Sequence, residues 1–332
     1  VVRFLLIFPT IFILVSMVFF VMRAIGDPIT AALGGRLSPA QLAARIHSAG
    51  YDRPVLTQYI DYLGQIARGD FGRTLTTNQS IGEVLATYGM ATVELTVYSV
   101  IVALVVGIPL GMLAAHRRDT KTDASARIFG ILAYATPVFF VGLLLKLVFG
   151  VLLPILPIAG RASLTDELLI SSVPGATGFY LIDALRTGDP ALILDVLSHA
   201  VLPALTLGLL TAGVFMRLVR TNMIGTLNND YVDAARSRGV SEYRLVTKHA
   251  YRPALIPVIT VVGMQIAVLL SGAVLTETTF EWKGLGFELA HFLSARDFVA
   301  VQGIVALLAV VVAVTNFLVD VLAAIIDPRI KY

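Results

Sequence analysis

Long apolar runs alternate with polar segments along the whole chain. Residues 4–22 carry no charged side chain and lie between Arg3 and Arg23. A helix of roughly 20 apolar residues is long enough to cross the hydrocarbon core of a bilayer. A secretory signal peptide is the alternative for this first run, but the run is longer than the usual apolar region of a signal peptide and no small-residue cleavage site follows it. By this criterion the pattern predicts six membrane-spanning helices, at about 4–22, 95–115, 128–153, 200–216, 253–275 and 298–322.

The composition supports a membrane protein. Hydrophobic residues make up 57% of the 332 residues and charged residues only 14%, whereas soluble domains carry about 25% charged residues. Because every backbone polar group in lipid must be bonded internally, we expect an all-α, polytopic membrane protein forming one transmembrane domain over residues 1–332. The chain has no cysteine, which excludes disulfides, thiolate metal sites and cysteine catalysis. Its net charge of +3 is too balanced to indicate nucleic-acid binding.

The distribution of basic residues predicts the orientation. With the N-terminus in the cytoplasm, the inside segments hold 14 Lys and Arg against 6 acidic residues, and the outside segments hold 10 against 15. Basic residues gather on the cytoplasmic side of membrane proteins. We therefore expect both termini in the cytoplasm. The segments assigned to the outside are too long for simple connectors, and Ser38, Pro39 and Gly50 predict a short helix over 38–49 there.

The sequence shows no motif for ATP hydrolysis, metal binding or proteolysis. No lysine follows a Gly-rich phosphate-binding pattern, so we expect the chain not to hydrolyse ATP. The five histidines lack metal-ligand spacing. Ser271 with Gly272 could suggest an intramembrane protease, but no predicted span contains a histidine to serve as its base. A non-enzymatic protein without a bound cofactor is the expectation.

The polar segment between the fourth and fifth spans, residues 228–250, is the most informative stretch. Asp230 is a suitable N-cap for a helix over 231–238, and Gly239 can end that helix in the left-handed conformation. Ser241 then begins a second helix that continues into the fifth span. A short helix presenting small residues can enter a groove of another protein. An ordinary solvated basic loop is the alternative, and the residues alone do not decide between the two.

The same segment resembles the EAA loop of ABC-importer permeases. Asp233-Ala234-Ala235, followed after three residues by Gly239, has the spacing of that loop with Asp in place of Glu. His249-Ala250 and the later 254–257 are similar to the peptide and nickel branch of the family. Four further stretches also resemble that branch, namely 51–73, 136–144, 277–303, and Asp320 with Asp327-Pro328-Arg329. The resemblance covers nearly the whole chain.

This resemblance implies a type I ABC-importer permease fold with extracytoplasmic loop helices, located in the bacterial inner membrane. It implies that the chain forms half of a translocation pathway for di- or oligopeptides, with nickel or another small ligand as an alternative cargo. The implied partners are a homologous second permease subunit, two ATPase subunits that bind ATP and Mg, an extracytoplasmic substrate-binding protein and the lipid bilayer. A self-contained secondary carrier or channel is the competing hypothesis, but it would need repeated ionisable groups within the spans or an internal repeat.

Two sets of residues follow as candidates. Small residues would allow close approach to the ATPase groove, and charged residues would contact its rim. The residues expected to couple the chain to the ATPases are Tyr231, Asp233, Ala234, Ala235, Arg236, Arg238, Gly239, Val240, Ser241, Tyr243 and Arg244. Polar residues inside spans are candidates for the translocation path, and these are Gln265, Ser271, Asn316 and Asp320.

Overall fold

The computed structural model describes residues 2–35 and 37–326, without the side chains of 2–6, 260, 271, 272, 320 and 322–326. Over these residues the chain is helical, and an isolated bridge between Arg73 and Ser80 is the sole β-type pairing. The prediction of an all-α protein is therefore confirmed for the described part. Asp327, Pro328 and Arg329 lie outside it. The chain divides into two compact units, one of Val1–Thr92 with Lys283–Phe317 and one of Val93–Trp282 with Leu318–Tyr332. The single permease domain remains a prediction.

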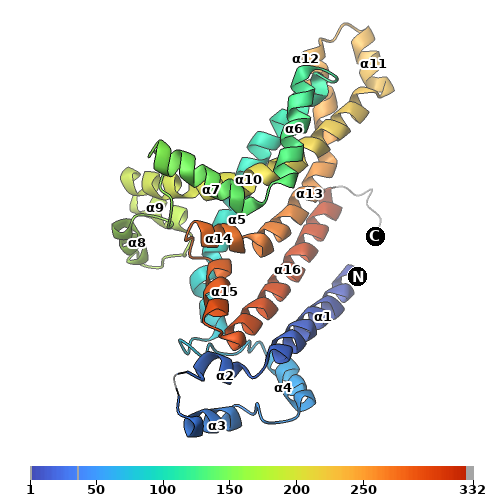
Figure 1. Ribbon diagram of the computed structural model, residues 1–332. Coiled ribbons are helices and arrows are strands. Elements are labelled where there is room, and N and C mark those ends of the chain that lie inside the picture. The colour runs from blue at the N-terminus through green and yellow to red at the C-terminus, as the bar shows by residue number, and fades with distance from the viewer. Residues whose placement is uncertain (1, 36, 327–332) are drawn as a thin grey trace. The chain divides into compact units, whose positions relative to one another are not determined.

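The first unit contains the helices at the two ends of the chain. They are α1 (Val2–Ile25), α2 (Pro28–Leu33), α3 (Pro39–Ser48), α4 (Val55–Ala67), the beginning of α5 (Ile81–His116), α15 (Leu285–Ser294) and most of α16 (Phe298–Ile326). Figure 1 shows α1 running beside α16 with α4 across one end of α1. Their shared core contains Val15, Phe19, Tyr62 and Ala306, and the rings of Phe19 and Tyr62 stack with centroids 5.3 Å apart.

The short helix predicted over 38–49 is present as α3. Ser38 precedes it in an extended conformation and forms a capping box with Gln41, in which each side chain bonds the other residue's backbone N–H. Pro39 occupies the first helical position, where its missing N–H costs no hydrogen bond. The local sequence therefore determined this helix.

The second unit contains the remaining helices. They are the rest of α5, α6 (Lys121–Ala135), α7 (Val138–Leu145), the π-helical η1 (Lys146–Leu152), α8 (Leu164–Ser171), α9 (Tyr180–Thr187), α10 (Pro190–Leu227), α11 (Asp230–Ser237), α12 (Glu242–Arg244), the π-helical η2 (Leu245–Ala250), α13 (Tyr251–Gly272), α14 (Val274–Thr279) and the end of α16. The 38-residue helix α10 contacts α6, α7, α9 and α13. Helix α10 is therefore the central helix of this unit.

Five of the six predicted spans are long apolar helices, by length and composition, in the described part of the chain. The third, predicted over 128–153, is present as a bent pair of helices. Helix α6 meets the helical stretch formed by α7 and η1 at an angle of 107° (Figure 1). Pro137 lacks an N–H and drives the residue before it into the extended region, and Thr136 has φ −87° and ψ 129°. The broken pair has the apolar character of one span.

Helices α5 and α10 approach each other through small residues. A Cβ added to Gly208 of α10 would lie 2.6 Å from the Cβ of Val102 and 2.9 Å from the carbonyl oxygen of Ser99, both in α5. The surrounding core includes Ala103 and Ala212. Small residues let helix backbones pack closely where apolar lipid supplies no hydrophobic driving force between helices. This contact therefore depends on the missing side chain of Gly208.

A buried ion pair ties the loop after η1 to α5. Glu94 and Arg161 are both buried and paired, and Glu94 also accepts hydrogen bonds from the Tyr98 hydroxyl at 2.8 Å and the Leu181 N–H at 3.0 Å. The Arg161 guanidinium lies 3.6 Å from the ring centroid of Tyr180. Burial raises the pKa of Tyr180 to about 12. With so many partners, the carboxylate of Glu94 holds the segment from 161 to 181 in place.

We expect Gly208→Ala to lower the melting temperature of the purified protein in detergent, because overpacking of a tight contact costs about 1–3 kcal/mol. The matched control is Gly225→Ala, also in α10, where an added Cβ would meet nothing within 4 Å. In the control, alanine should be neutral or stabilising by up to about 1 kcal/mol, since it is the better helix former. Equal melting temperatures for the two variants would contradict the close α5–α10 contact.

Candidate functional site

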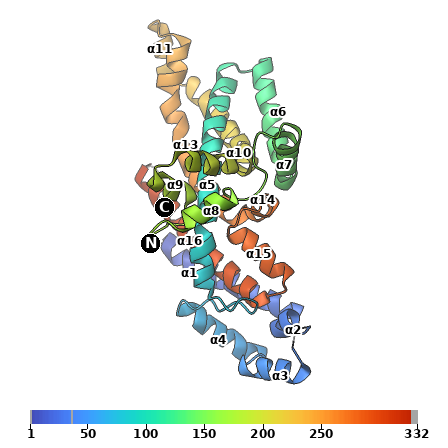
Figure 2. The same cartoon turned by 90° about the vertical axis from the view of Figure 1, so that its left-hand side faces the viewer.

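The segment 228–250 forms a helical hairpin at one tip of the second unit, beyond the end of α10 (Figure 1, Figure 2). Helix α10 ends at Leu227 and α11 begins three residues later at Asp230. The carbonyl of Asn229, which is extended, accepts the N–H groups of Val232 at 2.9 Å and Asp233 at 3.3 Å. The N-cap position is therefore Asn229, and the prediction of Asp230 is wrong by one residue. Asp230 instead lies in the first turn of α11, where its negative charge interacts favourably with the positive end of the helix dipole.

Gly239 ends α11 as predicted. Its φ is +80°, its N–H donates to the Arg236 carbonyl at 3.0 Å, and the next N–H, of Val240, donates back to Ala235 at 3.2 Å. A Cβ at Gly239 would meet nothing within 4 Å, so backbone conformation and not crowding selects glycine here. For an ordinary residue the left-handed conformation costs roughly 1–2 kcal/mol.

The second helix of the hairpin continues into the fifth predicted span. The carbonyl of Ser241 accepts the N–H of Leu245 at 3.0 Å, although the Ser241 hydroxyl makes no capping bond. Helical backbone then runs without interruption from Glu242 through η2 and α13 to Gly272. Segment 228–250 is thus joined directly to two long helices, α10 and α13.

The charged residues of the hairpin fall into two groups. Arg236 pairs with Asp233 at 2.5 Å and with Glu242 at 2.7 Å, bridging the two arms of the turn. Glu242 also raises the pKa of Arg236 by hydrogen bonding. Arg238 and Arg244 are exposed, and no acidic residue in the described part of the chain pairs with them. Glu242 was not among the predicted site residues, although its place six residues after Arg236 is readable in the sequence.

The exposed face of the hairpin combines small and aromatic side chains. Ala234 is exposed and Ala235 half-buried, while Tyr231 and Tyr243 are 45% and 75% exposed. Val232 is fully buried, and α11 contacts both η2 and α10. The Tyr231 hydroxyl also donates to the His249 carbonyl at 3.4 Å. One face of α11 is therefore fixed to the protein, and the other is open to a partner.

A second ion pair fixes α10 close to the segment. Asp123 of α6 is fully buried, and Arg220 of α10 donates to its two carboxylate oxygens at 2.6 and 2.8 Å. The N–H of Asp119 donates to the same carboxylate at 3.1 Å. This bidentate geometry is among the strongest that two charged side chains form. The pair was not predicted from the sequence, because 97 residues separate its members.

The four residues predicted for the translocation path receive less support. Gln265 is half-buried in α13, and Asn316 is exposed in α16. The side chains of Ser271 and Asp320 lie outside the described residues. Their assignment to a path stays a prediction.

Comparison with known proteins agrees with the resemblance seen in the sequence. The family described as binding-protein-dependent transport system inner membrane component matches residues 107–332. The di/tripeptide transport system permease protein DppB of Pseudomonas aeruginosa (strain UCBPP-PA14) is 38% identical over 329 residues, which cover 98% of this chain and 96% of that protein.

The dipeptide transport system permease protein DppB of Escherichia coli (strain K12) is 36% identical over 329 residues, covering 98% of this chain and 96% of that protein. A solved structure of the MetNI methionine ABC transporter in an inward facing conformation overlaps with a TM-score of 0.49 at 15% identity, covering 71% of this chain and 93% of that chain. The predicted importer-permease resemblance and fold class are confirmed, the fold class by the helical structure and the family match.

We expect Arg220→Gln to destabilise the protein, because it removes the bidentate partner of the buried Asp123 carboxylate and leaves it only Arg127 Nε at 3.8 Å. The cost should be about 3 kcal/mol, near the lower end for breaking a buried ion pair, since the Arg220 side chain is itself 19% exposed. The double variant Asp123→Asn with Arg220→Gln should recover much of this loss, because no buried charge then remains. Thermal unfolding of the wild type and of the single and double variants measures the coupling. If the losses in free energy of unfolding of the two single variants added up in the double variant, the coupling between Asp123 and Arg220 would be contradicted.

Proposed function

Because the chain belongs to the family of binding-protein-dependent transport system inner membrane components, we propose that it forms half of the pathway through which an ATP-binding-cassette importer moves di- and oligopeptides. The relatives support this cargo, since the two described above are named as di/tripeptide and dipeptide permeases and align with this chain over 98% of its length. Family membership and the apolar helices make it a multi-pass inner membrane protein.

The observation that carries the coupling mechanism is the hairpin at the junction of α10 and α13. Its exposed face is small at Ala234, and beside it Arg238 and Arg244 are exposed and have no acidic partner among the described residues. Small residues can enter a groove deeply, and rim charges favour a partner of opposite sign. In the proposed mechanism, this face docks into a separate ATPase subunit.

Movement of the docked hairpin would reach the spans through rigid elements. α11 is connected to α10 by two residues, and α12 continues as one helical stretch into α13. The Asp123–Arg220 pair ties α6 to the same end of α10. A displacement of the hairpin would therefore act on three helices of the second unit together. Domain rocking of this kind is a common way to switch between two states.

The proposed assembly contains four further kinds of component. They are a homologous second permease subunit, two ATPase subunits carrying ATP and Mg, an extracytoplasmic substrate-binding protein and the surrounding bilayer. In this proposal the hairpin and both termini face the cytoplasm, as the distribution of Lys and Arg indicates. ATP hydrolysis is assigned to the ATPase subunits, because the chain has no phosphate-binding loop.

Ala234→Trp should uncouple the permease from its ATPases. The added ring would sit on an exposed helix face, so folding should be unaffected, but docking of α11 in a groove should be blocked. We expect ATPase co-purification and ATP-dependent uptake in proteoliposomes to fall by at least about tenfold, as for loss of an interface hot spot. Gly239→Trp should show the same loss together with a disturbed turn.

The matched control is Ala43→Trp, which places the same ring on an exposed face of α3. It should assemble and transport like the wild type. Normal ATPase binding and uptake by both Ala234→Trp and Gly239→Trp would contradict the docking assignment.

The cargo is tested separately in proteoliposomes that contain all subunits. A labelled dipeptide should be taken up with ATP, and unlabelled di- and tripeptides should compete, whereas Ni²⁺ should not. ATP-dependent uptake of Ni²⁺ without uptake of the dipeptide would contradict the peptide assignment and leave the coupling mechanism intact. Uptake by this chain alone, without ATPases, would favour a self-contained carrier.

A further inference from the structure

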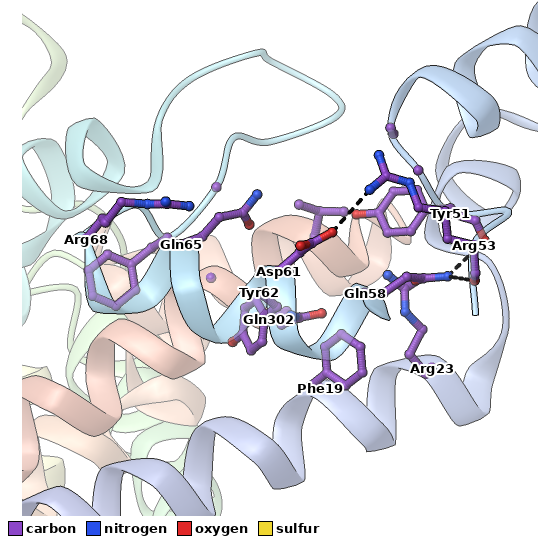
Figure 3. A pocket seen from close by; sticks show the side chains of 16 residues that line it. Phe19, Arg23, Tyr51, Arg53, Gln58, Asp61, Tyr62, Gln65, Arg68 and Gln302 are labelled. Carbon is purple, nitrogen blue, oxygen red and sulfur yellow. Dashed lines mark hydrogen bonds and ion pairs between the residues drawn. The ribbon is translucent and has the colours of Figure 1, made fainter. Parts of the chain in front are cut away.

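The first unit contains a polar cavity of about 270 Å³ that has no part in the coupling hairpin (Figure 3). Its walls come from the end of α1, the turn that contains Tyr51, helix α4 and the beginning of α16. The charged residues in its lining are three arginines, Arg23, Arg53 and Arg68, and one acid, Asp61. Its lining therefore carries an excess of positive charge.

Among the described residues, an acid pairs with just one of these arginines. Arg53 pairs with Asp61 at 3.2 Å (Figure 3). No carboxylate in the described part of the chain pairs with Arg23 or Arg68. The Arg23 guanidinium lies 4.2 Å from the ring centroid of Tyr51, which fixes its position without cancelling its charge.

Three polar atoms of the lining are buried without a hydrogen-bond partner among the described residues: Arg23 Nε, Gln58 Oε1 and the Tyr62 hydroxyl. None of the three is accessible to solvent. The amide nitrogen of the same Gln58 donates to two backbone carbonyls, those of Tyr51 at 3.0 Å and Arg53 at 2.7 Å. Buried polar atoms are rarely left unpaired, and such a group indicates an absent water or ligand. The free Nε is a donor on a cation, which suits an anionic oxygen.

The cavity lies level with the ends of two candidate spans. The candidate span Ile7–Ile25 ends two residues after Arg23. The candidate span Phe298–Val319 begins one residue before Val299, which lines the cavity. The ends of spanning helices meet the lipid headgroups, where arginine side chains are found. Arg23 therefore lies near the end of a candidate span, where lipid headgroups begin.

An apolar surface adjoins the cavity on the same two helices. On α4, Leu56 and Ile60 are 67% and 61% exposed, while Tyr59 and Tyr62 face α1. On α1, Met17 and Phe20 are 56% and 49% exposed. An amphipathic helix with this division between faces is suited to lie in the membrane interface.

We propose that this cavity binds the phosphate of an anionic phospholipid, with the acyl chains lying along the exposed apolar side chains of α1 and α4. The arginine cluster supplies the charge for a phosphate, and the adjoining apolar surface favours a lipid over free phosphate as its source. Arg23 contacts the phosphate through its terminal guanidinium nitrogens, and Arg68 adds positive charge elsewhere in the same lining.

The test is lipid retention by the assembled complex. The complex is purified from nanodiscs containing equal amounts of dioleoyl-phosphatidylglycerol and dioleoyl-phosphatidylcholine, and retained lipids are counted by native mass spectrometry. The wild type should retain phosphatidylglycerol preferentially. Arg23→Gln with Arg68→Gln should reduce that retention by at least about tenfold, since two surface arginines contribute that much to anionic-lipid binding.

Arg45→Gln is the matched control, because Arg45 is an exposed arginine of α3 outside the cavity. It should retain phosphatidylglycerol like the wild type. The double variant Arg23→Lys with Arg68→Lys keeps both positive charges. It should retain most of the phosphatidylglycerol that the Gln double variant loses. A second arm adds inorganic phosphate to the wild-type complex in neutral detergent and follows its melting temperature.

Several outcomes would overturn the proposal. Equal retention of the two lipids by the wild type would do so whether or not any variant folds. Unchanged phosphatidylglycerol retention in the folded Gln double variant would show that these arginines do not bind it. A rise in melting temperature with inorganic phosphate, without one from phosphatidylglycerol, would assign the site to a soluble anion.

Discussion

The structure depends on one constraint, which is that a backbone crossing lipid must satisfy its own hydrogen bonds. Water is absent there, and an unpaired N–H or C=O costs several kcal/mol. Helices meet this requirement locally, and the described residues consist of helices joined by short connections. Where proline removes a bond at 137, the chain does not tolerate a gap but turns by 107° and begins a new helix. Every other feature of the molecule is added to this helical frame.

Close contact between the helices comes from small residues and buried ion pairs. Gly208 lets α10 approach α5 at a distance that no side chain would permit. Glu94 with Arg161 and Asp123 with Arg220 then join segments that lie 67 and 97 residues apart in the sequence. Breaking either pair would strand a buried charge, so both specify one arrangement of the helices in the second unit. The long helix α10 takes part in the Gly208 contact and in the Asp123 pair.

The proposed function uses the mechanical continuity of that unit. The hairpin between α10 and α13 is held from within by Val232 and by Arg236, while Ala234, Arg238 and Arg244 remain exposed. A partner gripping the exposed face would move helices that are themselves tied to their neighbours. The first unit carries a different feature, the arginine-lined cavity beside an apolar surface. We propose a different partner for each feature, an ATPase subunit for the hairpin and an anionic lipid for the cavity.

The sequence by itself determined every property that is encoded locally. The apolar runs predicted the long helices, Ser38, Pro39 and Gly50 predicted α3, and Gly239 predicted the turn, because composition, capping and left-handed backbone depend on a few adjacent residues. The spacing of Asp233, Ala234, Ala235 and Gly239 likewise indicated the family. Only the tertiary structure decided that the helices on either side of Pro137 meet at 107°, that Arg236 pairs with Glu242, and that Arg23, Arg53 and Arg68 line one cavity. Such features arise from side chains that meet across turns and between helices, and a linear sequence does not specify which charges meet or how far a helix turns at a proline.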